Sequence, residues 1–196
     1  MSFQVHESSL PGVCILAPQV FSDERGLFAE TWNDKDFKAL GFGDVFVQDN
    51  LSRSAHGVLR GLHFQIHSPQ AQVVNVIHGE IFDVVVDLRR GSPTYRQWCS
   101  FELSSAKPKL LYMPPGCAHG FCVLSEQADI YYKVTQFYSP GDEGGIAWND
   151  PDMNIPWPCS SPHVSHRDAA YPSLRDIPTD KRPHTVFTPT SGARPA

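Results

Sequence analysis

The chain has 196 residues, of which 41% are hydrophobic and 19% charged, a composition typical of folded globular proteins rather than of disordered or membrane-spanning chains. The formal net charge of −5 argues against a nucleic-acid-binding protein, because such proteins usually present a basic face. It leaves nucleotides open, since a few clustered arginines are enough to bind a phosphate.

Five cysteines without a CxxC pair are more typical of reduced thiols than of a disulfide framework or a zinc site. The N-terminal segment has neither the basic nor the apolar region of a signal peptide. The longest apolar runs are interrupted by Asp and are too short to span a bilayer. We therefore expect a cytoplasmic protein that binds neither membrane nor nucleic acid.

Short β-rich segments separated by turn residues dominate the chain. Strand character appears at 13–18 and 27–32, and an Asn cap, helical spacing and a closing Gly then predict one short helix over 33–43. Within 72–88, β-branched residues predict two strands joined at a Gly-centred turn. The remaining predicted strands lie at 45–50, 58–65, 95–104, 108–116, 118–125 and 129–138.

Many short strands at near-even spacing, with Gly and Pro in the turns, predict an all-β fold. The leading candidate is a jelly-roll, cupin-like β-sandwich or barrel with a few short helices. We expect one domain over residues 1–172. Residues 173–196 are polar and Pro-rich, so we expect a loose C-terminal tail.

Cupin jelly rolls bind metal through two motifs, G-x5-H-x-H-x3,4-E-x6-G and P-x-G-x2-H-x3-N, and this chain fills only part of them. His63 and His119 stand at ligand positions, while the other three positions hold Gln65, Gln72 and Val123. Amides are poor ligands for zinc or iron. His67 would lie about 13 Å from His63 at ~3.3 Å per strand residue, too far to share an ion. We expect no bound metal.

Arg60 lies three residues before His63 in "RGLHF". A lone strand histidine is most often a core residue satisfied by a neighbour. An arginine on the concave face of a small barrel is costly unless an anion meets it, so this pair indicates a phosphorylated or nucleotide-linked ligand.

Several segments, in order, resemble the dTDP-4-dehydrorhamnose 3,5-epimerase family over residues 10–172. They are "DERGLFAETW", "FVQDNLSRS", "GVLRGLHFQ", "GEIFDVVVDLRRGSPTY", "MPPG", "AHGF", "YYKVTQFYSP", "EGGIAWNDP" and "VSHRDAAYP". The resemblance implies a jelly roll that forms a homodimer and needs no metal or other cofactor. It also implies conversion of dTDP-4-dehydro-6-deoxy-D-glucose to dTDP-4-dehydro-L-rhamnose.

This chemistry requires a base on one face of the sugar and a proton donor on the other, because the hydrogens at carbons 3 and 5 both flank the carbon-4 ketone. The resemblance assigns His63 as the base, Asp168 as the carboxylate that orients it, and Tyr132 as the donor. Tyr131 should face the opposite side of the strand.

The resemblance also implies a set of substrate-binding residues. Arg25 and Arg60 would contact the pyrophosphate, and Tyr138 would provide an aromatic platform near the base. In the family, residues near Arg25 and Glu30 reach into the neighbouring subunit's site. The other matching positions are Glu30, Gln48, Asn50, Gln72, His119, Glu143 and Arg167.

Gln72 departs from the family, which usually has a lysine at this position to stabilise the enolate oxygen. A glutamine donates without charge, which weakens the interaction by ~1–2 kcal/mol and the rate by about tenfold. Three alternatives to double epimerisation therefore stay open: epimerisation at carbon 3 or 5 alone, a different substrate such as a CDP-linked sugar, or a binding protein with weakened catalysis.

Overall fold

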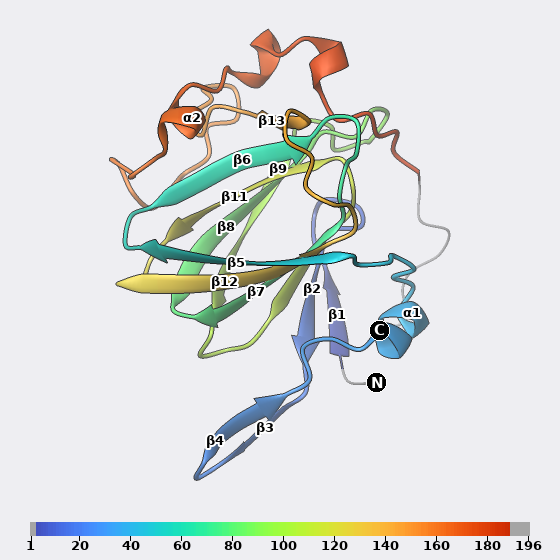
Figure 1. The fold of residues 1–196 in the computed structure, drawn as a ribbon, viewed down its shortest axis with the longest axis vertical. Coiled ribbons are helices and arrows are strands. Elements are labelled where there is room, and N and C mark those ends of the chain that lie inside the picture. The colour runs from blue at the N-terminus through green and yellow to red at the C-terminus, as the bar shows by residue number, and fades with distance from the viewer. Residues whose placement is uncertain (1–2, 189–196) are drawn as a thin grey trace.

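The computed structural model describes residues 3–188, whose strands form two main antiparallel sheets and a projecting hairpin (Figure 1). One sheet contains β1 (Phe3–Glu7), β2 (Cys14–Pro18), β5 (Gln48–Ala55), β7 (Gln72–His78), β10 (Leu110–Met113) and β12 (Gln127–Val134). The other contains β6 (Leu59–Gln65), β8 (Glu80–Asp87), β9 (Trp98–Ser104), β11 (Cys117–Val123) and β13 (Glu143–Gly145). The hairpin pairs β3 (Val20–Asp23) with β4 (Gly26–Ala29).

The strand order confirms the predicted all-β jelly roll. It is β1-β2-β10-β7-β12-β5 in the six-stranded sheet and β13-β6-β11-β8-β9 in the five-stranded sheet. Neighbours that are distant in sequence, such as β7 with β10 and β6 with β11, are typical of this architecture. The sequence does not predict β1, β3 or β13, because each is short and two of them lie in segments that resemble turns.

Strand β8 carries apolar side chains on both of its faces. Ile81 and Val85 point into the core between the two sheets. Val84 and Val86 point to the other face, where they pack beneath the C-terminal part of the chain. Alternate residues of β8 therefore pack into two different cores, one on each face of the sheet. This accounts for the nearly continuous run of β-branched residues.

Helix α1 (Asp34–Ala39) is confirmed where the sequence predicts it. The Asn33 side chain caps it by accepting from the backbone N–H groups of Lys35 and Asp36. Phe37 is buried and packs edge-on against Phe3, with ring centroids 5.2 Å apart. The helix lies beside β1 and β2 (Figure 1) and packs on the outer face of the six-stranded sheet, against Leu16 and Val73.

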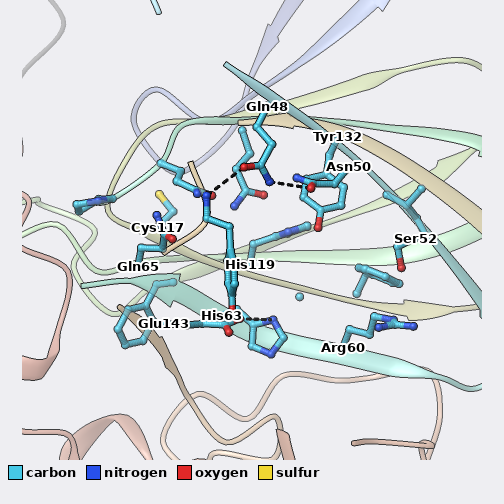
Figure 2. A pocket seen from close by; sticks show the side chains of 18 of the residues that line it. Gln48, Asn50, Ser52, Arg60, His63, Gln65, Cys117, His119, Tyr132 and Glu143 are labelled. Atoms are coloured by element: carbon cyan, nitrogen blue, oxygen red, sulfur yellow. Dashed lines mark hydrogen bonds and ion pairs between the residues drawn. The ribbon is translucent and has the colours of Figure 1, made fainter. Parts of the chain in front are cut away.

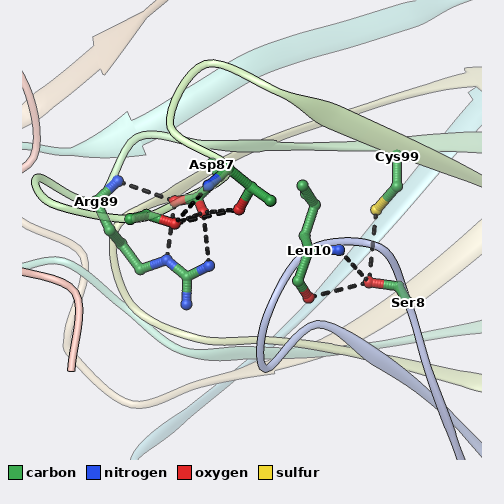
Figure 3. A network of polar contacts seen from close by, with 7 residues as sticks. Ser8, Leu10, Asp87, Arg89 and Cys99 are labelled. Carbon is green, nitrogen blue, oxygen red and sulfur yellow. Dashed lines mark hydrogen bonds and ion pairs between the residues drawn. The ribbon is translucent and has the colours of Figure 1, made fainter. Parts of the chain in front are cut away.

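The end of β8 is fixed by a buried ionic network (Figure 3). The fully buried Asp87 carboxylate accepts from the Arg89 guanidinium at 2.8 and 2.7 Å, and also from the hydroxyls of Ser92 and Thr94. Burial opposes ionisation, but these hydrogen bonds hold the pKa of Asp87 below its ordinary value. Arg89 also lies 5.1 Å from the ring of Phe187, which ties the network to the C-terminal segment.

Residues 173–188 do not form the loose tail that we expect from their composition. Leu174 and Ile177, 1% and 5% exposed, pack into the outer core of the five-stranded sheet. Arg182 donates to the carbonyl oxygens of both. The segment includes the short helices η1 (Leu174–Asp176) and η2 (Thr179–Lys181), and it lies above the five-stranded sheet in Figure 1. The remainder of the expected tail, 189–196, lies outside the described residues.

No helix within the described range 3–188 is long and apolar enough to cross a membrane.

Replacing Leu174 with Ala should lower the free energy of unfolding by about 2–5 kcal/mol, because it leaves a cavity at a fully buried position. Urea denaturation measures the change. The matched control is Lys181→Ala in the same segment, where the side chain is exposed and the effect should stay within about 0.5 kcal/mol. An unchanged midpoint for Leu174→Ala would mean that this segment does not stabilise the barrel.

Candidate active site

A cavity of about 460 Å³ opens between the two sheets, and polar side chains from both walls enter it (Figure 2). The wall from the six-stranded sheet presents neutral groups, namely Gln48, Asn50, Ser52, Gln72 and Tyr132. The opposite wall, from β6, β11, β13 and α2 (His166–Ala169), presents the ionisable groups Arg60, His63, His119, Glu143 and Arg167. Arg53 of β5 also reaches the lining, but it is largely exposed and pairs with Asp129. Apart from this residue, the six-stranded sheet forms a neutral wall, and the ionisable groups lie on the opposite wall.

A register shift in β6 brings Arg60 and His63 to the same pocket. His63 pairs with His119 of β11 and Arg60 pairs with Phe121, so three steps along β6 match two along β11. The extra residue is a β-bulge, which turns the two side chains toward one face although their separation is odd. The Arg60 Nε donates to Ser54 Oγ at 2.9 Å, and this bond anchors the guanidinium at one end of the cavity.

His63 lies against a buried carboxylate. Its Nε2 is 2.9 Å from Oδ1 of Asp168, whose side chain is 3% exposed. Because an ionised carboxylate only accepts, Nε2 carries the proton of a neutral ring, and Nδ1 keeps its lone pair. Nδ1 faces Oε1 of Glu143 at 3.8 Å, on the cavity side of the ring. The free basic atom of His63 therefore points toward the space that a ligand would occupy.

Asp168 is kept ionised by its surroundings. Burial alone would raise its pKa, but the hydrogen bond and charge of His63, the Gly61 N–H at 3.2 Å and Ser165 together lower the pKa to about 2. Ser165 caps α2 by accepting from the N–H of Asp168, which fixes the residue in the first turn. The carboxylate thus carries its charge throughout the neutral pH range.

Arg167 and Glu143 form an ion pair beside the base. Arg167 Nη1 donates to Glu143 Oε2, and Arg167 Nη2 lies 3.5 Å from His63 Nε2. The guanidinium Nε is also 3.5 Å from Asp168 Oδ1. Two carboxylates and one guanidinium therefore surround the imidazole and restrict its orientation.

Tyr132 projects into the cavity from the neutral wall. Burial raises the pKa of its hydroxyl, the Arg60 charge opposes this effect and the Glu143 charge adds to it, so the phenol is protonated at neutral pH. Tyr131 points to the other face of β12, where its hydroxyl donates to Asp49 at 2.6 Å. The expected alternation of the two tyrosines is confirmed.

Most of the residues that the sequence singles out meet in this one cavity. Asp168 lies directly behind His63, and the cavity is lined by Gln48, Asn50, Arg60, His63, Gln72, His119, Tyr132, Tyr138, Glu143 and Arg167. Arg25 and Glu30 are not among the lining residues. Arg25 is at the tip of the β3–β4 hairpin, with a side chain 84% exposed and paired with Asp23, and Glu30 accepts from Asn33. Within one chain the hairpin projects outward from the two main sheets (Figure 1).

The sequence reasoning missed a second histidine–carboxylate pair. His119 Nε2 lies 3.0 and 2.9 Å from the two oxygens of Asp83, which is fully buried. Burial raises the pKa of Asp83, and the adjacent His119 opposes the shift. A signal was present, because an Asp within an otherwise β-branched strand requires a buried partner.

The two histidines of the partial cupin motif are thus each paired with an aspartate rather than with each other. Nδ1 of His67, beyond the end of β6, lies 3.4 Å from Nδ1 of His184. Across residues 3–188, no three His, Cys, Asp or Glu side chains come close enough to hold a metal ion.

Comparisons with known proteins identify the family of the chain. The sequence profile of the family described as dTDP-4-dehydrorhamnose 3,5-epimerase matches residues 7–176. The enzyme of that name from Pseudomonas aeruginosa is 49% identical over 162 residues, 82% of this chain and 90% of the relative. The Methanothermobacter thermautotrophicus enzyme is 45% identical over 179 residues, covering 90% of this chain and 97% of the relative.

Two solved structures are also similar. The dTDP-6-deoxy-D-glucose-3,5-epimerase of Legionella pneumophila, in complex with dTDP-4-keto-L-rhamnose, aligns with a TM-score of 0.91 at 41% identity, covering 95% of this chain and 99% of that one. A 3'-monoepimerase from Streptomyces bikiniensis, in complex with dTDP-quinovose, aligns with a TM-score of 0.82 at 32% identity, covering 87% of each chain. On the profile match and these identities, the chain belongs to the dTDP-4-dehydrorhamnose 3,5-epimerase family.

Proposed function

We propose that this protein epimerises a nucleotide-linked 4-keto-6-deoxyhexose, with dTDP-4-dehydro-6-deoxy-D-glucose as the substrate. The observation that carries the proposal is the arrangement of His63, backed by Asp168, on one wall of the cavity and Tyr132 on the other. A base and an acid on opposite sides of a bound sugar ring are what inversion at carbon requires.

In the proposed reaction, His63 Nδ1 removes the proton next to the ketone. The electrons of the broken C–H bond form a carbon–carbon double bond, and the carbonyl pair moves onto the oxygen to give an enolate. When the enolate collapses, Tyr132 returns a proton to the opposite face of the same carbon. The protonated His63 is stabilised by Asp168, and both groups recover their starting states by exchange with solvent.

The wall that carries the ionisable side chains suits the diphosphate of the proposed ligand. Arg60 is anchored at one end of the cavity by Ser54, and its remaining N–H groups match the oxygens of a diphosphate. The Legionella relative and the Streptomyces monoepimerase are both described with dTDP-linked ligands. We propose that Gln48, Asn50, His119, Tyr138, Glu143 and Arg167 contact the same substrate.

We also propose that the enzyme is a homodimer, works without a metal and acts in the cytoplasm. Phe21, Leu27 and Phe28 of the projecting hairpin are 56%, 54% and 69% exposed, which is costly unless a partner covers them. A second subunit would also bring Arg25 and Glu30 to a neighbouring site. A monomer in light scattering would argue against this part of the proposal.

The proposed cytoplasmic location is supported by the five free cysteines, which suit a reducing compartment.

Solvent exchange tests the reaction directly. With dTDP-4-dehydro-6-deoxy-D-glucose in D2O, NMR should show deuterium entering carbons 3 and 5, with equal rates in the presence and absence of EDTA. Tyr132→Phe should slow inversion about 10²–10⁴-fold because it removes the proton donor. The control Tyr131→Phe removes a hydroxyl from the outer face of the same strand and should stay within about twofold of the unmodified rate.

The outcomes separate the candidate functions. Exchange at one carbon alone would identify a single-site epimerase. Exchange only with CDP-linked sugars would show that the substrate carries CDP rather than dTDP. Binding of dTDP without any exchange would indicate a sugar-nucleotide binding protein. Equal rates for the two tyrosine variants would remove Tyr132 from the mechanism.

Gln72 generates a separate prediction. Its side chain lines the neutral wall, so Gln72→Lys should raise the exchange rate by about tenfold by placing a cation near the enolate. Initial rates under saturating substrate measure this change. A rate that falls in Gln72→Lys while dTDP affinity is unchanged would show that the pocket is adapted to a neutral group at this position.

A further inference from the structure

A short hydrogen-bond relay runs along the neutral wall of the cavity (Figure 2). The backbone N–H of Tyr138 donates to Gln48 Oε1 at 3.1 Å, and Gln48 Nε2 donates to Asn50 Oδ1 at 2.8 Å. A backbone N–H can only donate, so Gln48 must turn its oxygen to Tyr138 and its nitrogen to Asn50. The relay therefore fixes the orientation of the Asn50 amide. Its oxygen accepts from Gln48, and its NH2 group remains available to donate to a ligand.

Strand register places this NH2 group beside the proposed proton donor. Asn50 of β5 pairs directly with Tyr132 of β12, and Tyr132 pairs with Val74 of β7. Directly paired residues have Cβ atoms about 4.5–5.5 Å apart. Gln72 lies two residues before Val74 and so shares its face of the sheet. One amide, Asn50, thus stands directly opposite Tyr132, and a second, Gln72, which pairs with Val134, is its diagonal neighbour on β7.

Both amides have donors to spare. Among residues 3–188, no group accepts from Asn50 Nδ2, and no hydrogen bond to a neighbour holds the Gln72 side chain. The carbonyl oxygen of the substrate is attached to the carbon between carbons 3 and 5. It therefore lies close to whichever carbon Tyr132 reprotonates, and one fixed donor next to Tyr132 can serve both positions.

We propose that Asn50 is a catalytic residue that donates, with Gln72, to the sugar carbonyl oxygen as it becomes an enolate. This inference rests on the proposed function and names its oxyanion site. For this step Gln48 is a positioning residue, because it sets which end of the Asn50 amide faces the ligand. Preorganised neutral donors can stabilise a developing negative charge strongly, since they need no reorientation during the reaction.

Two variants test the donor and the relay separately. Asn50→Leu keeps the approximate shape and removes the donor. Gln48→Glu still accepts from the Tyr138 N–H but presents a second oxygen to Asn50, which forces that amide to rotate and turn its oxygen toward the ligand. The control is Gln4→Glu, the same chemical change at an exposed position on β1. Each protein is assayed for deuterium exchange in D2O and for dTDP affinity by calorimetry.

We expect both pocket variants to lose about 10–100-fold in exchange rate at every carbon that the unmodified protein exchanges. Affinity for dTDP should stay within about twofold in Asn50→Leu, which changes no charge, and Gln4→Glu should match the unmodified protein. Unchanged exchange in Asn50→Leu, or equal losses of rate and dTDP affinity, would overturn the inference while leaving the epimerase assignment intact. No exchange by the unmodified protein would defeat the proposed function itself, and the inference with it.

Discussion

A buried carboxylate that remains charged is the feature on which the pocket depends. Asp168 is almost inaccessible to solvent, yet the adjacent imidazole of His63 and hydrogen bonds from Gly61 and Ser165 lower its pKa to about 2. Its charge settles the protonation of the His63 ring, because only a ring with a proton on Nε2 can satisfy it. The basic nitrogen is then directed into the cavity, so one interaction sets both the position and the protonation state of the proposed base.

The two sheets of the jelly roll contribute different kinds of side chain to the pocket. The five-stranded sheet carries the ionisable groups, and its outer face is covered by the segment that contains Leu174 and Ile177. The six-stranded sheet faces it mainly with amides and a phenol. The proposed base, backed by a carboxylate, thus faces the proposed acid, a neutral phenol, across the ligand space. This asymmetry suits removal of a proton on one side and its return on the other.

Local sequence patterns predict the strands and the helix whose formation depends on neighbouring residues in the chain. Alternating apolar residues locate the central strands, and Asn33 with Gly41 marks the ends of the one early helix. The partial cupin motif and Arg60 draw attention to His63, but its partnership with Asp168 and the role of Tyr132 follow from a resemblance that spans most of the chain. Spacing alone cannot predict contact between residues 105 positions apart. The opposite directions of Tyr131 and Tyr132 follow from strand geometry.

Other features depend on contacts that sequence periodicity does not encode. The bulge that gives Arg60 and His63 a common face arises from pairing with β11. Leu174 and Ile177 are isolated apolar residues in a Pro-rich segment, and only the surface beneath them makes them core residues. The partnership of Asp83 with His119, and the relay from Tyr138 to Asn50, likewise require the assembled barrel.

The most direct measurement of the central claim is the tautomer of His63, observed by NMR of protein labelled with nitrogen-15 in histidine. Its signals are assigned by their loss in His63→Gln. The neutral ring should carry its proton on Nε2, and Asp168→Asn should abolish that preference. A neutral ring protonated on Nδ1, or a tautomer that Asp168→Asn leaves unchanged, would contradict the assignment of Asp168 as the group that prepares the base.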